Sequence, residues 1–462
     1  MKPKHILALG LLVLGLGSCG ESFFEQYPSN NITEGNFYKT DDDFNQGVVA
    51  CYAKLKTQMS FHLTEIGYRG DENVLESMAV STQNRYDIDH FAETANNGIL
   101  NDIWNAWYNG IYRCNDVLDH MTGAKIANYD KYRGECLFLR SWWYFNLYRV
   151  FGVVPITRTV VTPAAAKLIP RCTEEEMYTL LTEDLAEAAR LLPPTPGPEK
   201  ARVANIAAYT LLAKVYLTFG KPAEAKTALE EAMKNTSYGL ESTTKKVFDV
   251  GNKMNREIIF ALYYNKTNDN GHGYWYSANT DVLADINNPT PTFKAIYDSE
   301  KDNRLPLISS YTKIKDNLFA MTKWYDTYDA TYTTQVGNDF PHLRYADVVL
   351  MYAEALAESG GSLGDALEWL NKTRTRAGLD ELTTDEVKSL AEFRRELAAE
   401  RGREFALEGH RWFDLVRLGL AVDYFREMGY SLDSHNLIFP IPQNQIEIVN
   451  NPSILWQNPG FN

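Results

Sequence analysis

Apolar side chains recur at helical spacing through most of the 462-residue chain. Positions i, i+3, i+4 and i+7 share one face of a helix, so each such segment is predicted to be amphipathic and helical. Asp41, Asp42 and Asp43 supply an N-cap and first-turn carboxylates for the first of them. The predicted helices are 41–58, 97–121, 128–151, 173–192, 201–219, 222–235, 344–358, 363–377, 384–408 and 411–428.

One pair of predicted helices has the spacing of a tetratricopeptide repeat. Its signature positions hold Tyr209, Leu212, Ala213, Tyr216, Gly220, Ala225, Leu229 and Ala232. The small Ala213 and Ala225 let two antiparallel helices approach closely, while the larger residues fill the space between neighbouring repeats. A degraded copy spans 344–377. The chain is therefore predicted to be all-α, with a tetratricopeptide-like helical-repeat scaffold.

The helical period fades between residues 236 and 340, where Asn, Asp, Gly and Pro become frequent. Residues 263–332 contain 13 aromatic side chains, whereas the similarly long stretch 174–237 contains 4, so aromatics concentrate where regular structure is weakest. Residues 60–96 form a second irregular stretch. Long irregular segments on a rigid scaffold usually carry function, so both are predicted to contribute to ligand binding.

Composition narrows the class of ligand. The formal net charge is −14, which argues against nucleic acid as the main partner because phosphate binding requires clustered Lys and Arg. The chain has 28 tyrosines against 21 phenylalanines. Tyrosine combines a flat apolar ring with a polar tip, so such an excess suits a wet binding surface.

The N-terminus resembles a bacterial lipoprotein signal. Lys2 and Lys4 precede an apolar run from Ile6 to Leu16, which is too short to span a bilayer but has the length of a signal-peptide core. Gly17 and Ser18 then lead to Cys19, which is the predicted site of acylation. Removal of residues 1–18 would leave a body attached to the membrane by its N-terminal lipid anchor only.

Four further cysteines, at positions 51, 114, 136 and 172, form no CxxC pair. A zinc ribbon or a thioredoxin-type site is therefore not indicated. Cys114 and Cys136 lie inside helical patterns and are predicted to pack as small buried hydrophobes. The spacing leaves the disulfide state of all four open.

Three blocks of sequence resemble the SusD/RagB family of outer-membrane nutrient-binding lipoproteins. The first is Glu135 to Ile156, with an aromatic-rich helix and a Gly-x-x-Pro exit; the second, Glu400 to Gly419, contains the string Glu-Gly-His-Arg-Trp-Phe-Asp-Leu at 408–415. The third is the tail from Phe439-Pro440-Ile441-Pro442 to Gly460. Leu418 departs from the pattern, since an aromatic is common there.

The resemblance implies a lipoprotein of the outer membrane, facing the cell surface, that lies over a SusC-like TonB-dependent transporter. It implies capture of oligosaccharides, or of peptides in some members, and their delivery to that transporter without catalysis. It also implies a helical-repeat scaffold that carries an irregular ligand-binding part. With the patterns above, the expected limits are a signal peptide at 1–18, a helical region at 19–235, the ligand-binding region at 236–340 and a C-terminal helical region at 341–462, with 19–462 forming one compact unit.

Five charged residues could be mistaken for a catalytic centre. On a helix, Glu400, Arg401, Glu404, Glu408 and Arg411 continue the apolar stripe of Phe393 and Leu397. Such charges are predicted to be partly buried and paired with one another, because an isolated buried charge is costly. No cofactor or metal is predicted: Gly271-His272-Gly273 lacks the third glycine of a dinucleotide loop, since Tyr276 stands there.

Sugar binding requires aromatic rings against the C–H faces of a pyranose and planar polar side chains at its hydroxyls. The two irregular stretches supply both types. The predicted ligand-binding residues are Trp275, Tyr276, Trp324, Tyr325, Tyr68, Arg69, Asp71, Asn73 and Tyr86. By contrast, the tryptophans on helical patterns are predicted to pack in the core; these are Trp104, Trp107, Trp142, Trp143 and Trp412.

Two other classes of function remain open at the level of sequence. The repeat helices alone would suit a protein-interaction scaffold that binds only protein partners. A lipid-anchored glycan hydrolase needs only two well-placed carboxylates, and 60 acidic residues leave that possibility open.

Overall fold

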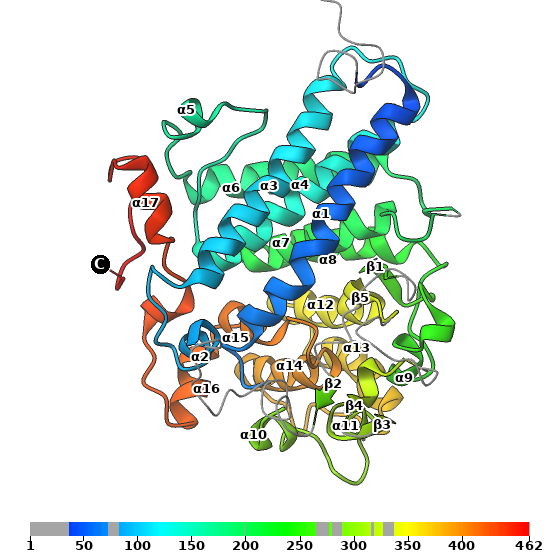
Figure 1. The fold of residues 1–462 in the computed structure, drawn as a ribbon. Helices are drawn as coiled ribbons and strands as arrows, with labels where there is room; N and C mark the ends of the chain where they lie inside the picture. Colours follow the sequence, from blue (N-terminus) through cyan, green and yellow to red (C-terminus); the bar gives the residue numbers. More distant parts are fainter. Residues whose placement is uncertain are drawn as a thin grey trace, which may run out of the picture.

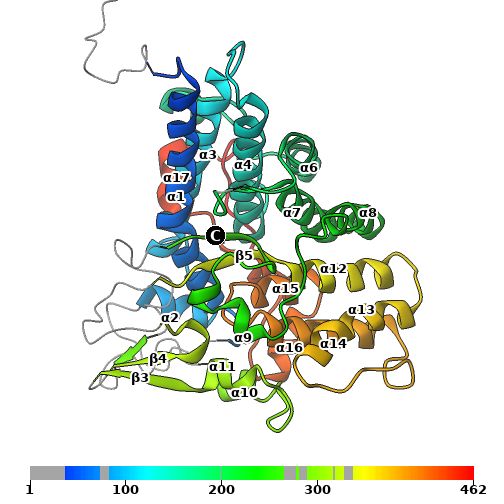
Figure 2. The same ribbon diagram turned by 90° about the vertical axis from the view of Figure 1, so that its right-hand side faces the viewer.

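The structure, a computed structural model, describes residues 37–72, 83–197, 199–264, 277–279, 289–315, 318–326 and 337–461. Three long helices stand side by side at one end of the molecule (Figures 1 and 2). They are α1 (Asp41–Gly67), α3 (Gly98–His120) and α4 (Tyr129–Phe151). Gly110 of α3 lies against Trp143 of α4, where an added Cβ would fall 2.2 Å from the indole. Glycine is therefore what lets these two helices approach.

The N-terminus of α1 differs slightly from the prediction. The N-cap is Thr40, whose Oγ1 accepts a hydrogen bond from Asp43 N at 3.2 Å, while Asp43 Oδ2 accepts one from Thr40 N at 2.7 Å. The three aspartates occupy the first turn, where their charge favours the helix dipole. The helix also runs to Gly67, nine residues beyond the expected end at 58.

Successive antiparallel helices form the second part of the scaffold (Figures 1 and 2). They are α6 (Glu174–Leu191), α7 (Asn205–Thr218), α8 (Pro222–Met233), α12 (Tyr345–Glu358), α13 (Leu363–Arg376) and α14 (Leu390–Glu404). The pair α7–α8 is the predicted repeat, and Ala213 and Ala225 are both fully buried at its interface. The pair α12–α13 is the degraded copy, and α12 packs on α8, which joins the two repeats. The all-α repeat fold is confirmed.

The C-terminal segment returns to the first helices. Its elements are α15 (Arg411–Arg417), α16 (Ala421–Glu427), the 3-10 helix η5 (Ser434–Leu437) and α17 (Gln443–Val449). Gly419 adopts a φ of 70° and ends α15, so the predicted helix 411–428 is two short helices. The side chain of Asn458 donates to the carbonyls of Phe151 and Phe439, which ties the tail to the end of α4.

The described parts of 236–340 contain short elements, of which no helix exceeds the five residues of α11 (Leu305–Ser309). Strand β1 (Ile258–Leu262) pairs antiparallel with β5 (Phe340–Arg344), and a second sheet has the order β2-β4-β3. The remaining elements here are β2 (Ser277–Asn279), β3 (Tyr311–Lys315), β4 (Leu318–Met321), α9 (Thr244–Val247), η2 (Val250–Asn252), α10 (Pro291–Lys294) and η4 (Thr322–Trp324). Two more short helices, α2 (Gln83–Asp89) and α5 (Pro163–Ala166), lie in loops of the N-terminal half.

The core confirms the assignment of the helical tryptophans. Trp107 and Trp143 are completely buried, and Trp104, Trp142 and Trp412 are at most 6% exposed. Cys51, Cys114, Cys136 and Cys172 are buried free thiols in the structure, as predicted for Cys114 and Cys136. Within the described ranges, no helix combines the length and the apolar character needed to cross a membrane.

Candidate functional site

The charged string at 400–411 spans the end of α14, the turn after it and the first residue of α15. Glu400, Arg401, Glu404, Glu408 and Arg411 are all buried. Helical spacing accounts only for the first three, because α14 ends at Glu404 and not at the predicted residue 408, so Glu408 lies in the turn and Arg411 begins α15. The prediction that these five residues pair with one another is wrong, however. Among the described residues, every ion pair that one of the five makes is with a residue outside the five. The helix supplies only one side of the network, and other segments supply the opposite charges.

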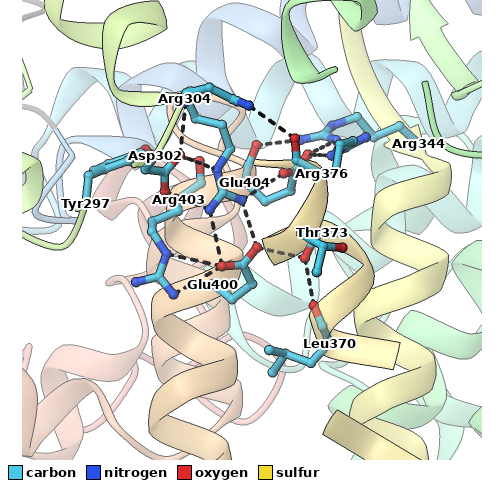
Figure 3. Close-up of polar contacts among 12 residues, drawn as sticks. Tyr297, Asp302, Arg304, Arg344, Leu370, Thr373, Arg376, Glu400, Arg403 and Glu404 are labelled. Carbon is cyan, nitrogen blue, oxygen red and sulfur yellow. Dashed lines mark hydrogen bonds and ion pairs between the residues drawn. The ribbon is translucent and has the colours of Figure 1, made fainter. Parts of the chain in front are cut away.

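Arg304 and Arg344 connect this helix to the irregular region (Figure 3). Nη1 of Arg304 lies 2.8 Å from Glu400 Oε1 and 3.0 Å from Glu404 Oε2, while its Nη2 lies 2.8 Å from Asp302. Burial opposes the charged form of Glu404, but Arg376, Arg344 and Arg304 outweigh it and hold its pKa below the usual value. The charges are therefore mutually compensated, and the network acts as a rigid floor rather than as a reactive site.

Arg344, at the start of α12, also pairs with glutamates of the charged string, as Arg304 does. Its Nε lies 2.9 Å from Glu408 Oε2, and its Nη1 lies 2.6 Å from Glu404 Oε1 and 2.8 Å from Glu257 Oε1. Lys323, in the 3-10 helix η4 directly after β4, adds a contact of 2.7 Å to Glu408. The irregular region is thus fastened to α14 and to the turn after it by the buried cations Arg304, Lys323 and Arg344.

The first irregular stretch is fastened to the same string. Arg411 makes two contacts with the Asp71 carboxylate, Nε to Oδ1 at 2.8 Å and Nη2 to Oδ2 at 3.2 Å. Glu72 accepts a hydrogen bond from Leu407 N at 3.1 Å. Thr290 Oγ1 donates to the carbonyl of Asp71 at 2.8 Å, which joins the two irregular stretches directly. Segments more than 200 residues apart in the chain thus meet over one buried floor.

Three of the predicted ligand contacts turn out to be parts of that anchorage. Tyr68, Arg69 and Asp71 are at most 3% exposed. Arg69 pairs with Glu93, and its guanidinium lies over the ring of Phe439 at 4.0 Å. The expectation that these side chains face a sugar is corrected, because all three are buried, and Arg69 and Asp71 are already paired with charged groups of the protein.

Trp324 also requires correction. Its side chain is 1% exposed and packs against Phe248, with ring centroids 5.2 Å apart, and Phe340, at 6.1 Å. A sequence count of aromatics cannot separate a ring that holds a loop to the scaffold from one that faces solvent. In this structure Trp324 does the former, so it offers no face to a pyranose.

Tyr86 and Tyr325 remain accessible to a ligand, since both are half-buried. Tyr86 on α2 stacks on His90 with ring centroids 3.8 Å apart and an interplanar angle of 16°. This stack fixes the orientation of the tyrosine ring and adds an imidazole that was not singled out in the sequence. The i, i+4 spacing of the two residues is the signal that could have revealed it. Trp275, Tyr276, Asn73 and the lipidation site Cys19 lie outside the described residues.

A hollow of about 610 Å³ lies between α1 and β1, where the aromatic-rich stretch begins. Tyr52 and Tyr263 both line it, and Tyr263 is 44% exposed. Lys253 Nζ lies 4.1 Å from the centre of the Tyr263 ring. Aromatic rings beside hydrogen-bond donors are the combination that sugar recognition requires. Tyr263 lies within the predicted aromatic-rich stretch, but no feature of the sequence distinguishes it from its neighbours.

One short segment has the spacing of a catalytic motif without its structural context. Gly360-Gly361-Ser362-Leu363-Gly364 has the spacing of a nucleophile elbow, but Ser362 caps α13 in a helix–helix turn, with its Oγ accepting from Asp365 N at 3.0 Å. A nucleophile elbow instead lies between a strand and a helix. Over the described ranges, no group of three or more His, Cys, Asp or Glu side chains is arranged to hold a metal ion.

Comparison with known proteins places this architecture in one family. Residues 302–461 match the model of the SusD family, and residues 27–217 match a model described as starch-binding associating with outer membrane. Over 99% of its length the chain is 25% identical to the whole of SusD-like protein P2 of Formosa agariphila. Over 154 residues, 31% of this chain and 26% of the relative, it is 33% identical to the starch-binding protein SusD of Bacteroides thetaiotaomicron.

A solved structure gives the same result for the fold. Surface glycan-binding protein A of Bacteroides thetaiotaomicron, in complex with laminarihexaose, superposes with a TM-score of 0.75 at 22% identity, covering 91% of this chain and 99% of that one. The two family matches lie on the two halves of the scaffold, and the match to the SusD family over 302–461 includes the buried string at 400–411. The chain belongs to the SusD/RagB family.

Proposed function

We propose that this protein is a lipid-anchored, surface-facing lipoprotein of the outer membrane that binds oligosaccharides and delivers them to a SusC-like TonB-dependent transporter. The observation that carries the proposal is the meeting of the two irregular, aromatic-bearing stretches over one buried ionic floor. A rigid floor holds the loops in place before a ligand arrives, which lowers the entropic cost of binding.

Relatives support the choice of glycan over other ligands. A family model matched here is described as starch-binding, and a solved protein of the same fold holds laminarihexaose. The accessible rings of Tyr86 and Tyr325 supply flat apolar faces, and the predicted Trp275 and Tyr276 would add to them. We propose that these four side chains stack on pyranose rings, with Asn73 among the groups that bond the hydroxyls.

Binding is tested by calorimetry of the purified protein against α- and β-linked glucose oligosaccharides. Tyr86→Ala should weaken binding about tenfold or more, as expected for loss of an aromatic anchor. Tyr112→Ala is the matched control, because Tyr112 is 45% exposed on α3 and lies in neither irregular stretch. Equal affinities of the two variants would place the sugar elsewhere.

The peptide-binding alternative predicts a different result. No glycan in the panel would bind, whereas mixed peptides would give saturable heat. Delivery to a transporter is tested by co-purification from detergent-solubilised outer membranes. Recovery of a TonB-dependent barrel supports the proposal, and recovery of only soluble partners together with failure to bind any glycan favours the protein-interaction scaffold.

A further inference from the structure

A second cavity lies away from both irregular stretches. It encloses about 400 Å³ between the end of α4, α7 and α15, and α15 is seen beneath α4 and α7 in Figure 2. Its apolar lining comes from residues on three segments: Phe145, Val153, Phe413, Val416, Leu437 and Ile438. The volume falls within the range of small-molecule sites. None of its lining residues belongs to the proposed glycan face.

Arg149 is the unusual residue in this cavity. Among the described residues it makes no ion pair, and its only hydrogen bond runs from Nη2 to Asn146 Oδ1. Its Nε is shielded from solvent without a hydrogen-bond partner. The guanidinium lies 3.9 Å from the centre of the Phe413 ring and 4.8 Å from that of Phe145. An aromatic ring stabilises a guanidinium that lies over its face, but it leaves the N–H donors in the plane of the guanidinium without an acceptor.

The other cations around the cavity have carboxylate partners. Lys214 pairs with Asp347, and Arg417 pairs with Glu354 and with Asp414, the latter at 3.0 Å. Asp414 also pairs with Arg401 at 2.8 Å. The remaining titratable groups are Glu174, which is exposed at the rim and accepts from Tyr148 Oη, and His410, whose pKa burial holds well below its usual value.

Arg149 is therefore a surplus cation. Burial lowers its pKa to about 9, with only partial compensation from the field of Asp414 and Asp347, whereas the neighbouring Arg417 has its pKa raised by direct carboxylate partners. Arg149 is half-buried, with its Nε shielded from solvent. A cation that is partly removed from water without a counter-charge costs free energy, and an anion entering the open cavity would reduce that cost. The planar fork of an arginine suits a carboxylate, which it can bind through two parallel hydrogen bonds.

We propose that this cavity is a binding site for a small organic acid, whose carboxylate pairs with Arg149 and whose apolar body lies against Phe413 and Ile438. The site is separate from the proposed glycan face and could be occupied together with it. The ligand class follows from one unpaired cation in a mainly apolar cavity. The hydroxyl groups of a sugar would find few polar partners on the apolar lining. An uncharged apolar molecule would leave the Arg149 cation without a counter-charge.

The test uses the full-length protein in detergent, titrated with phenylacetate and with phenylacetamide at constant ionic strength. The acid should bind saturably, and the amide, which has the same shape without charge, at least tenfold more weakly. Arg149→Gln should weaken phenylacetate binding at least tenfold. Arg158→Gln, which removes an exposed guanidinium paired with Glu183 at 2.9 Å, is the matched control and should bind as the parent does.

The proposal is overturned if the acid and the amide bind alike, if neither binds, or if Arg149→Gln binds phenylacetate unchanged. Because Arg149→Gln could fail to fold, a crystal soaked with 4-bromophenylacetate gives a second measurement. An anomalous bromine peak inside this cavity, with the carboxylate on Arg149, supports the site; a peak only elsewhere, or none, rejects it. Glycan titration of the same variant reports separately on the irregular face.

Discussion

Asp71→Asn should reveal how strongly the loop after α1 is held to the floor of the site. The Asp71 carboxylate has no exposed surface and receives two N–H groups of Arg411, at 2.8 and 3.2 Å, together with the hydroxyl of Tyr424. Asparagine has nearly the same size, so the substitution removes the charge and one acceptor without opening a cavity. The buried Arg411 cation is then left without its counter-charge.

Removing one partner of a buried ion pair typically costs about 3–5 kcal/mol of the free energy of unfolding. The lower end applies here, about 3 kcal/mol, because the asparagine oxygen still accepts one hydrogen bond and Arg411 Nη1 keeps its contact with the Ala398 carbonyl. The matched control is Asp423→Asn. Its partner Arg426 lies 2.6 Å away, but both side chains are more than 60% exposed, and such pairs contribute only about 0–1 kcal/mol.

Urea unfolding at pH 7, followed by circular dichroism and by tryptophan fluorescence, measures the difference. A gap of about 3 kcal/mol corresponds to a shift of the urea midpoint by about 1 M, with a slope near 3 kcal/mol/M. Adding Arg411→Met to Asp71→Asn should restore part of the loss, because it removes the unpaired cation. If Asp71→Asn unfolds within about 1 kcal/mol of Asp423→Asn, the ion pair does not fasten the loop.

Three further predictions concern other parts of the chain. Trp324→Ala should cost about 3–5 kcal/mol of unfolding free energy, whereas Trp456→Ala, where 42% of the side chain is exposed, should cost about 1 kcal/mol or less; similar urea midpoints would show that Trp324 is not a core residue. Burial raises the pKa of Glu72 to about 8 from its ordinary value of 4.5. Between these two pH values the folded protein keeps a proton on Glu72 that the unfolded chain has lost, so the free energy of unfolding falls as the pH rises from 4.5 to 8. Glu72→Gln should nearly match the parent in urea unfolding at pH 5 and exceed it at pH 8.5, with an advantage that grows by about 1.4 kcal/mol for each pH unit up to the folded pKa; parallel pH profiles would contradict this. Cys19→Ser should move the protein from the detergent phase to the aqueous phase in a phase-partition assay; continued partition with detergent would mean that the anchor is not on Cys19.

The burial of the charged string could be predicted from the sequence, but its partners could not. A spacing of 100° per residue places Glu400 and Glu404 on the same face as Phe393 and Leu397, and that face is buried. The counter-charges come from residues such as Arg304, which lies 96 positions from Glu400. Helical periodicity contains information about which face is covered and none about which distant segment covers it.

In the candidate site, too, some features could be predicted from the sequence and others could not. The sequence located both irregular stretches and the aromatic excess, because loop composition and loss of period are local properties. Whether a given ring in those stretches faces solvent depends on the chain that folds over it: Phe248 and Phe340 cover Trp324, while Tyr86 keeps an accessible ring beside His90. The missing counter-charge of Arg149 is likewise visible only once Asp347, Glu354 and Asp414 have been assigned to other cations.

The sequence by itself determined the elements whose cause lies within one or two helical turns: the α7–α8 repeat and the apolar faces that bury Trp107 and Trp143. Tertiary structure alone decided which charges meet, as in the pair of Asp71 and Arg411, separated by 340 positions. The physical reason is range. Helix periodicity acts between near neighbours, whereas a buried ion pair forms wherever two segments pack closely enough to exclude water from both charges.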